Sequence, residues 1–230
     1  MDSTARGCGW VQRALPYCGA IASLLYFGMD RLAGRVMPGY DFMSQSMSDL
    51  SAVGTSTRPL VVSINMLATM LIIAFGIGIG VWRMADRAFL PRATAGLVIG
   101  QALAGLSMIV FFPTQFGERP DASSTSVVIG ALGVMLLVLA IGFGAAAFRG
   151  WFRVLSIGIL LTYALLAFLR FATVARSPVE AAVSLVGAQE RTMFYIFLLW
   201  VLALTVYCLR SNVKSNPIGG IGVRQAHRAD

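Results

Sequence analysis

The sequence has few charged residues and a large excess of apolar ones. Only 12% of its 230 residues are charged, whereas 57% are hydrophobic and the mean hydropathy is +0.78. A soluble domain usually has about a quarter of its residues charged, so this chain has too little polar surface to coat a water-soluble globule. Several segments reach the roughly 20 apolar residues that a helix needs to cross a bilayer. The chain is therefore predicted to be an all-α, polytopic membrane protein.

Histidine is nearly absent, because the single one, His227, lies in the C-terminal tail. This excludes a histidine-ligated haem, a zinc site of the usual kind and a Ser-His-Asp triad. The three cysteines, Cys8, Cys18 and Cys208, lie far apart without a CxxC or another metal-ligand spacing. We therefore expect neither a metal nor a cofactor.

Six apolar spans follow one another, separated by basic turns or by segments rich in turn-forming residues. They are predicted at 16–33, 59–82, 93–112, 127–148, 154–175 and 192–209. Together they form one six-helix membrane domain, 14–210, after a polar N-terminus, 1–13, and before a Gly-rich tail, 211–230, that we expect to be disordered. A signal peptide also combines a basic start with an apolar run. Removing the first span, however, would leave an odd number of helices.

Basic residues gather on one side of this six-span frame. The termini and the turns near 83–92 and 149–153 carry the whole net charge of +8, whereas charges balance on the other side. The positive-inside rule therefore places both termini in the cytoplasm and makes the chain a multi-pass protein of the inner (cytoplasmic) membrane. Because topology accounts for the high pI, near 10.1, we expect no nucleic-acid partner.

The connections on the outward side are longer and hold most of the acids, and elaborated loops on one face usually mark the functional face. The polar run 44–65 is the densest of these regions. Asn65 follows Arg58 by about two helical turns, so both can project from one face. Candidate catalytic residues are Asp49 and Glu190. Candidate ligand-binding residues are Ser46, Ser48, Arg58, Asn65, Gln101, Arg170 and Arg191.

Each of these residues also has a purely structural interpretation. Asn65 and Gln101 are of a type that more often joins helices by hydrogen bonds. Glu190 suits a capped helix start, and Asp49 suits a turn or an N-cap. Arg170 can snorkel to the headgroups, or turn inward and pair with Asp49 or Glu190.

Small residues four apart occur in two neighbouring spans. The second span contains Gly76 and Gly80, and the third repeats the spacing with Gly96, Gly100 and Ala104. This spacing lets helix backbones approach closely in lipid. It is typical of packing inside one bundle, and it equally suits a homo-oligomer.

Three motifs resemble one family. The run SMSDLSAVGTSTRP, followed by Asn65, resembles the Ser-Asp-Leu, Pro and Asn signature of the Domain of Unknown Function 998 proteins. FFPT at the end of the third span and QERTMFYIFLLW at the start of the sixth are similar too. The resemblance covers about residues 14–210 and implies a six-helix integral membrane protein without an established activity. Members often carry a His after the third-helix Pro-Thr-Asp region, but here Gln115 follows Thr114 and no His follows before the tail.

Three functions remain open from the sequence. The first is an outward-facing polar pocket for a membrane lipid or isoprenoid-type ligand, with Asp49 or Glu190 as proton donor or acceptor. In it, Arg58 and Arg170 would hold an anionic headgroup and Asn65 would orient the ligand. The second is a structural or assembly subunit of a membrane complex. The third, a small transporter, is disfavoured because the midplane is almost free of charge and no repeat is evident.

Overall fold

The structure, a computed structural model, describes residues 3–81, 89–113, 115, 125–176 and 186–214. Within these ranges it is all-α, as predicted, apart from one isolated bridge between Val53 and Gln115. A short 3-10 helix, η1 (Ser48–Ser51), lies between the first two of six long helices. These are α1 (Ser3–Val36), α2 (Arg58–Val81), α3 (Phe89–Phe111), α4 (Thr125–Ala147), α5 (Trp151–Arg176) and α7 (Val186–Lys214).

Five of these helices, α2, α3, α4, α5 and α7, are long and apolar enough to cross a membrane. Helix α1 does not join them, and it carries Asp30 and Arg31 within its apolar stretch. A multi-pass membrane protein is thus supported, while the six-span count and the orientation of the termini stay predictions. Helix α7 begins at Val186, ahead of the predicted span at 192, so Glu190 and Arg191 lie in its first turns.

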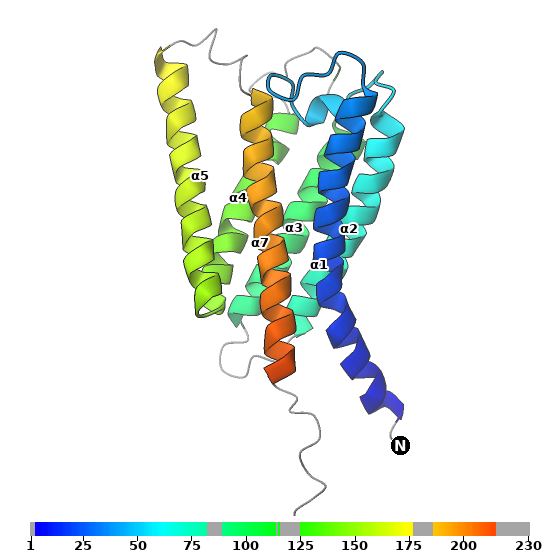
Figure 1. Cartoon of the computed structure of the whole chain (residues 1–230), viewed down its shortest axis with the longest axis vertical. Coiled ribbons are helices and arrows are strands. Elements are labelled where there is room, and N and C mark those ends of the chain that lie inside the picture. The colour runs from blue at the N-terminus through cyan, green and yellow to red at the C-terminus, as the bar shows by residue number, and fades with distance from the viewer. Residues whose placement is uncertain (1–2, 82–88, 114, 116–124, 177–185, 215–230) are drawn as a thin grey trace, which may run out of the picture.

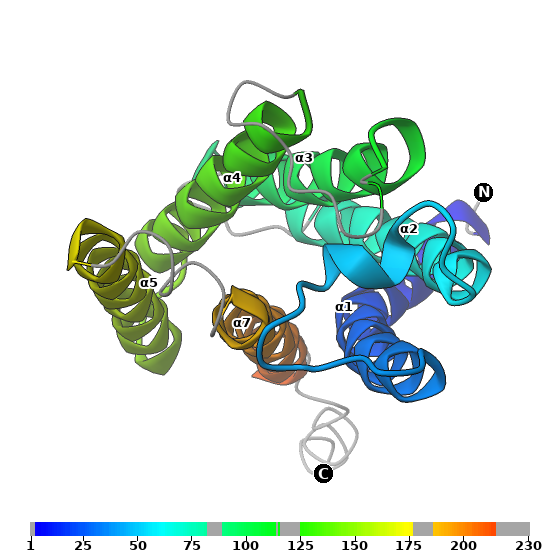
Figure 2. The same ribbon diagram turned by 90° about the horizontal axis from the view of Figure 1, so that it is seen from above.

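The helices pack in a ring whose order follows the chain. Each helix from α1 to α5 contacts the next one, and α7 contacts α5 on one side and α1 on the other (Figure 2). Residues 37–57, which we call the cap segment, lie across one end of the bundle, opposite the N-terminal end of α1 (Figure 1). We refer to that end as the cap end.

Two apolar clusters hold this arrangement together. The larger one runs through the bundle around Trp200, whose fully buried indole donates a hydrogen bond from Nε1 to Ser156 Oγ over 3.0 Å. The smaller one lies under the cap segment, where Leu50 of η1 packs against Met29 of α1 and Val61 of α2. Burial of Leu50, 1% exposed, fixes η1 on the two helices below it.

Small residues act as contact points inside the chain. A Cβ added at Gly76 would lie 2.6 Å from Ile99 of α3, and one at Gly80 would lie 3.5 Å from Ala95. The GxxxG pair of α2 therefore packs against α3, which is the packing inside one bundle that the motif predicts. Gly96 has nothing within 4 Å among the described residues. Association of two copies through that face stays a prediction.

Gly144 of α4 allows the closest approach to Trp200. A Cβ there would lie 2.7 Å from the indole atom Cζ2, whereas one at Gly142 would meet nothing within 4 Å. We expect Gly144→Ala to destabilise the protein by about 1–3 kcal/mol, because the packed indole must move. Gly142→Ala should be neutral or stabilising, since alanine favours helix. Unfolding of both variants in detergent would measure this, and equal stabilities would contradict the packing.

Candidate functional site

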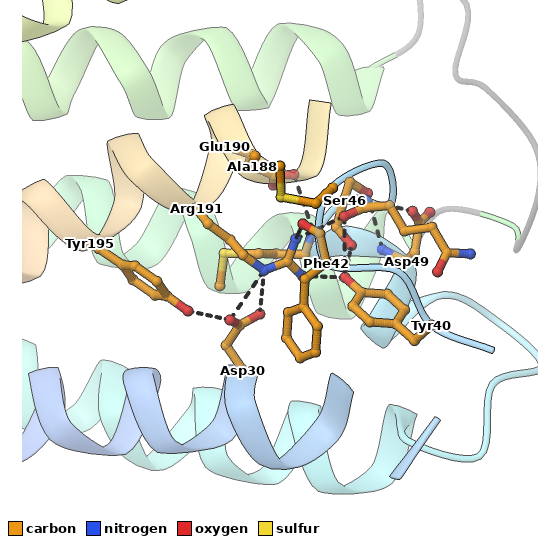
Figure 3. A network of polar contacts seen from close by, with 12 residues as sticks. Asp30, Tyr40, Phe42, Ser46, Asp49, Ala188, Glu190, Arg191 and Tyr195 are labelled. Carbon is orange, nitrogen blue, oxygen red and sulfur yellow. Dashed lines mark hydrogen bonds and ion pairs between the residues drawn. The ribbon is translucent and has the colours of Figure 1, made fainter. Parts of the chain in front are cut away.

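The cap end is organised by one buried ion pair. Nε of Arg191, in α7, lies 3.2 Å from both carboxylate oxygens of Asp30, in α1 (Figure 3). Asp30 is fully buried and Arg191 is 4% exposed. Burying two charges is costly unless they are paired and hydrogen-bonded, so each residue requires the other. The pair therefore fixes the side of α7 that faces α1.

Arg191 also anchors the cap segment. Its Nη1 donates to the carbonyls of Phe42 over 2.9 Å and Gln45 over 2.8 Å, and Nη2 donates to the Tyr40 hydroxyl. The same guanidinium lies over the rings of Tyr40 and Phe42, 5.3 and 5.0 Å from their centroids. One side chain thus holds the backbone and the rings of the cap segment on α7.

Two tyrosine hydroxyls complete the arrangement. Tyr195, one turn below Arg191 on α7, donates to Oδ2 of Asp30, and Tyr40 donates to the Ser46 carbonyl over 2.6 Å. We call Asp30, Tyr40, Arg191 and Tyr195, with the carbonyls that they bind, the cap network. Among the described residues, no buried side-chain nitrogen or oxygen lacks a partner. The cap network is therefore satisfied internally.

Gly187 permits this close contact between α7 and the cap segment. A Cβ at this position would lie 2.1 Å from the Gln45 carbonyl oxygen and 2.8 Å from that of Phe42. The neighbouring Ala188 N–H donates to the Met43 carbonyl over 3.0 Å. The first turn of α7 thus contacts the cap segment closely, because Gly187 has no side chain and the free N–H of Ala188 donates to the loop.

Asp49 and Glu190 lie beside the cap network without joining its ion pair. Oδ2 of Asp49 accepts the Ser46 N–H over 2.8 Å, and Oε2 of Glu190 accepts the Met47 N–H over 3.1 Å. Two carboxyl groups from distant parts of the chain thus bind successive peptide N–H groups. Both are half-buried, and within the described ranges neither forms a salt bridge. Both acids are catalytic candidates from the sequence, and both bind the backbone of the cap segment.

Ser46 and Ser48 lie in the same turn. Their hydroxyl oxygens are 2.7 Å apart, and Ser46 Oγ accepts the Asp49 N–H over 3.2 Å. The side chains of Ser46 and Asp49 thereby each accept the backbone N–H of the other residue, as in a capped turn. The turn interpretation of Asp49 fits this geometry, in which no described residue donates a hydrogen bond to its Oδ1 atom.

The family comparison covers all of these residues. The family model described as "Protein of unknown function (DUF998)" matches residues 20–207. The chain belongs to the DUF998 family. No curated protein and no solved structure matches it. The DUF998 region includes α2 to α5, the second half of α1, most of α7 and the whole cap network. It confirms the family resemblance seen in the motifs.

Within the described residues, two other predicted site residues of this DUF998 protein form no hydrogen bond with Asp49 or Glu190. Arg58 donates from Nη1 to the Ser51 carbonyl and from Nη2 to the Ile109 carbonyl, the latter over 3.4 Å. Asn65 is buried and donates from Nδ2 to the Met29 sulfur over 3.3 Å, so it joins α2 to α1. Arg58 and Asn65 therefore turn toward different neighbours.

Two further candidates lie on other helices of the DUF998 bundle. Gln101 is half-buried on α3 and forms no hydrogen bond with the described members of the cap network. Arg170 lies on α5, and its side chain is outside the described residues. Of the predicted set, Ser46, Ser48, Asp49, Glu190 and Arg191 are the ones that lie together.

Sequence reasoning missed Asp30, Tyr40 and Tyr195. Asp30 lies inside the predicted first span, near its outward end, and is one of the acids on that side of the frame. A signal was present, because one acid and one base placed within or beside two apolar spans are expected to find each other. The tyrosines gave no such signal, since their hydroxyl partners become evident only in the fold.

We expect Asp30→Asn to lower the free energy of unfolding by about 3–5 kcal/mol, because the Arg191 charge then stays buried without a counter-charge. Thermal unfolding in detergent would measure the loss. Asp41→Asn is the matched control, since Asp41 is exposed and should contribute little. The double variant Asp30→Asn with Arg191→Gln should recover part of the loss. Wild-type stability of Asp30→Asn would contradict the role of the ion pair.

The Tyr40 hydroxyl makes the cap sensitive to high pH. Burial, partly offset by its bond with Arg191, raises the pKa of Tyr40 to about 12 from an ordinary value of 10.0. In the unfolded chain Tyr40 loses its proton first, so its contribution is intact below pH 10 and is lost as the pH rises toward 12. The stability difference between wild type and Tyr40→Phe, followed by unfolding from pH 9 to 12, should shrink over that window. A constant difference would contradict this assignment.

Proposed function

We propose that this DUF998 protein binds the polar headgroup of a membrane lipid or isoprenoid-type lipid at the cap end, through Asp49 and Glu190. The observation that supports this is their placement on successive N–H groups, Ser46 and Met47, at the end of an apolar bundle. In the described part of the chain, the ion pair is formed by Arg191 and Asp30, so it neutralises neither acid.

The two carboxyl groups offer acceptor oxygens to a ligand that donates hydrogen bonds. Within the described part of the chain, Oδ1 of Asp49 and Oε1 of Glu190 are the atoms available to it, because Oδ2 and Oε2 accept backbone N–H groups. A headgroup with hydroxyl or ammonium groups suits these atoms. A proton shared by the two acids could pass to a bound lipid, which would make one acid a general acid and the other a base.

The orientation of the site follows from charge. The positive-inside rule places the cap end on the outward side, where lipid headgroups meet the bundle. Arg58 contributes less than the sequence suggests, because the carbonyls of Ser51 and Ile109 engage its guanidinium. We therefore assign the headgroup contact to the carboxyl groups.

A structural or assembly subunit is the second candidate. It is favoured by the cap network, whose described polar groups are satisfied without a ligand. On this alternative, Asp49 and Glu190 only fasten the cap segment to α7, through the N–H groups of Ser46 and Met47. The two candidates differ in whether Asp49 matters to a bound lipid when the fold is intact.

Native mass spectrometry of the protein purified in mild detergent would distinguish them. We expect a discrete lipid adduct in the wild type and its loss in Asp49→Asn and in Glu190→Gln, because an amide binds hydroxyl or ammonium groups less strongly. Asp41→Asn is the matched control, since it removes one exposed carboxylate from the same segment. Hydrogen bonds from the Ser44 hydroxyl and the Met43 N–H lower the pKa of Asp41, so it is ionised near neutrality.

The adduct should persist in Asp41→Asn. An adduct retained by folded Asp49→Asn and Glu190→Gln would overturn the headgroup site. The structural-subunit interpretation would be favoured if these variants lost only thermal stability and no lipid adduct occurred in any protein.

A further inference from the structure

Arg31 is the second charged side chain of α1 at the cap end, and it differs from its neighbour Asp30. Its guanidinium carbon lies 5.6 Å from the ring centroid of Phe27, 5.2 Å from that of Phe42 and 5.5 Å from that of Tyr195. Rings from α1, the cap segment and α7 thus hold one guanidinium group. Such cation–π contacts fix a charge in place without neutralising it.

No described residue gives Arg31 a carboxylate or a hydrogen-bond acceptor. Asp30 is bound by Arg191 and Tyr195, so the nearest acid in the sequence is already engaged. A guanidinium has five N–H donors, and its planar edge matches the oxygens of a phosphate. Arg31 is half-buried, so part of it stays accessible. It therefore presents donors and a positive charge to an anion from outside.

An exposed apolar face of α1 leads up to this guanidinium. Leu24 is 65% exposed and Phe27 46%, and they precede Arg31 by seven and four residues, which places all three along one side of the helix. Tyr17 and Ile21 continue the exposed face toward the other end of α1. A hydrocarbon chain lying on this face would bring its polar head to Arg31.

The position of Arg31 along α1 fits the headgroup layer. It lies five residues before the helix end at Val36, which corresponds to about 7 Å of helix. The headgroup region of a bilayer is about 5–7 Å thick on each side of the hydrocarbon. An arginine at this depth meets lipid phosphates.

We propose that Arg31, held on the rings of Phe27, Phe42 and Tyr195, binds the phosphate of a membrane phospholipid whose acyl chains lie along the exposed face of α1. The occupant is a phospholipid because the site combines an unneutralised guanidinium with adjoining apolar surface. This site does not use the carboxyl pair and does not require it. Asp49 and Glu190 suit donor groups, whereas Arg31 suits an anion.

The test is a lipid titration followed by native mass spectrometry in detergent, with phosphatidylglycerol, phosphatidylcholine and diacylglycerol as probes. We expect Arg31→Gln to bind both phospholipids about tenfold or more weakly than the wild type, because charge-assisted hydrogen bonds are lost. Diacylglycerol, which lacks the phosphate, should bind equally to both proteins. Arg31→Lys keeps the charge and should give an intermediate affinity, because an ammonium group cannot form the paired contact.

Arg35→Gln is the matched control. Arg35 lies one turn further along α1, is exposed, and has no described aromatic ring over it. The phospholipid affinity of Arg35→Gln should stay within about twofold of the wild type, since exposed charges contribute little. An equal loss in Arg35→Gln and Arg31→Gln would overturn the proposal, because surface charge alone would then explain binding.

Phospholipid binding by Arg31→Gln at wild-type affinity would overturn it as well. Thermal unfolding of each variant verifies that the bundle is intact. If Arg31→Gln does not fold, Phe27→Leu replaces it, because this change removes one ring from an exposed position and should also weaken phospholipid binding. Asp49→Asn should leave binding at Arg31 unchanged, so failure of the carboxyl site and failure of this one are distinguishable.

Discussion

The buried ion pair between Asp30 and Arg191 is the constraint on which the cap end depends. A charge inside an apolar bundle is stable only when an opposite charge and hydrogen bonds surround it. Arg191 meets this requirement with Asp30 at 3.2 Å, two loop carbonyls and Tyr40. Through these contacts Arg191 holds α7 beside α1, which is far from it in the sequence, and binds the cap segment to both helices.

Charged groups at the cap end fall into two kinds. Asp30 and Arg191 neutralise each other, and their remaining polar contacts are made within the protein. Among the described residues, Asp49 and Glu190 accept only backbone N–H groups with their side chains, and Arg31 contacts only aromatic rings. The first kind holds the fold together. The second kind offers acceptor oxygens at Asp49 and Glu190 and donor groups at Arg31, which is why we propose two chemically different lipid contacts there.

Glycine lets the polar cap fit on an apolar bundle. At Gly187 the carbonyl oxygens of Phe42 and Gln45 come so close that any side chain would collide with backbone. At Gly34 an added Cβ would lie 2.3 Å from the Phe42 ring, which itself contacts Arg31 and Arg191. Deeper in the bundle, Gly144 receives the Trp200 indole in the same way. Close approach through small residues is how helices pack when lipid provides no hydrophobic force between them.

The sequence alone determined that the chain is helical, apolar and a member of its family, because hydropathy and short motifs are local properties. It also located the polar region near Asp49 and Glu190, since both lie where apolar spans meet long connections. It did not reveal that Arg191 pairs with Asp30, or that Arg58 and Asn65 turn toward separate neighbours. Those outcomes depend on which helix faces lie side by side. The tertiary structure decided these pairings, because a buried charge pairs with whichever opposite charge lies near it across the bundle. Asp30 and Arg191, 161 positions apart, come into contact only after α1 and α7 have packed.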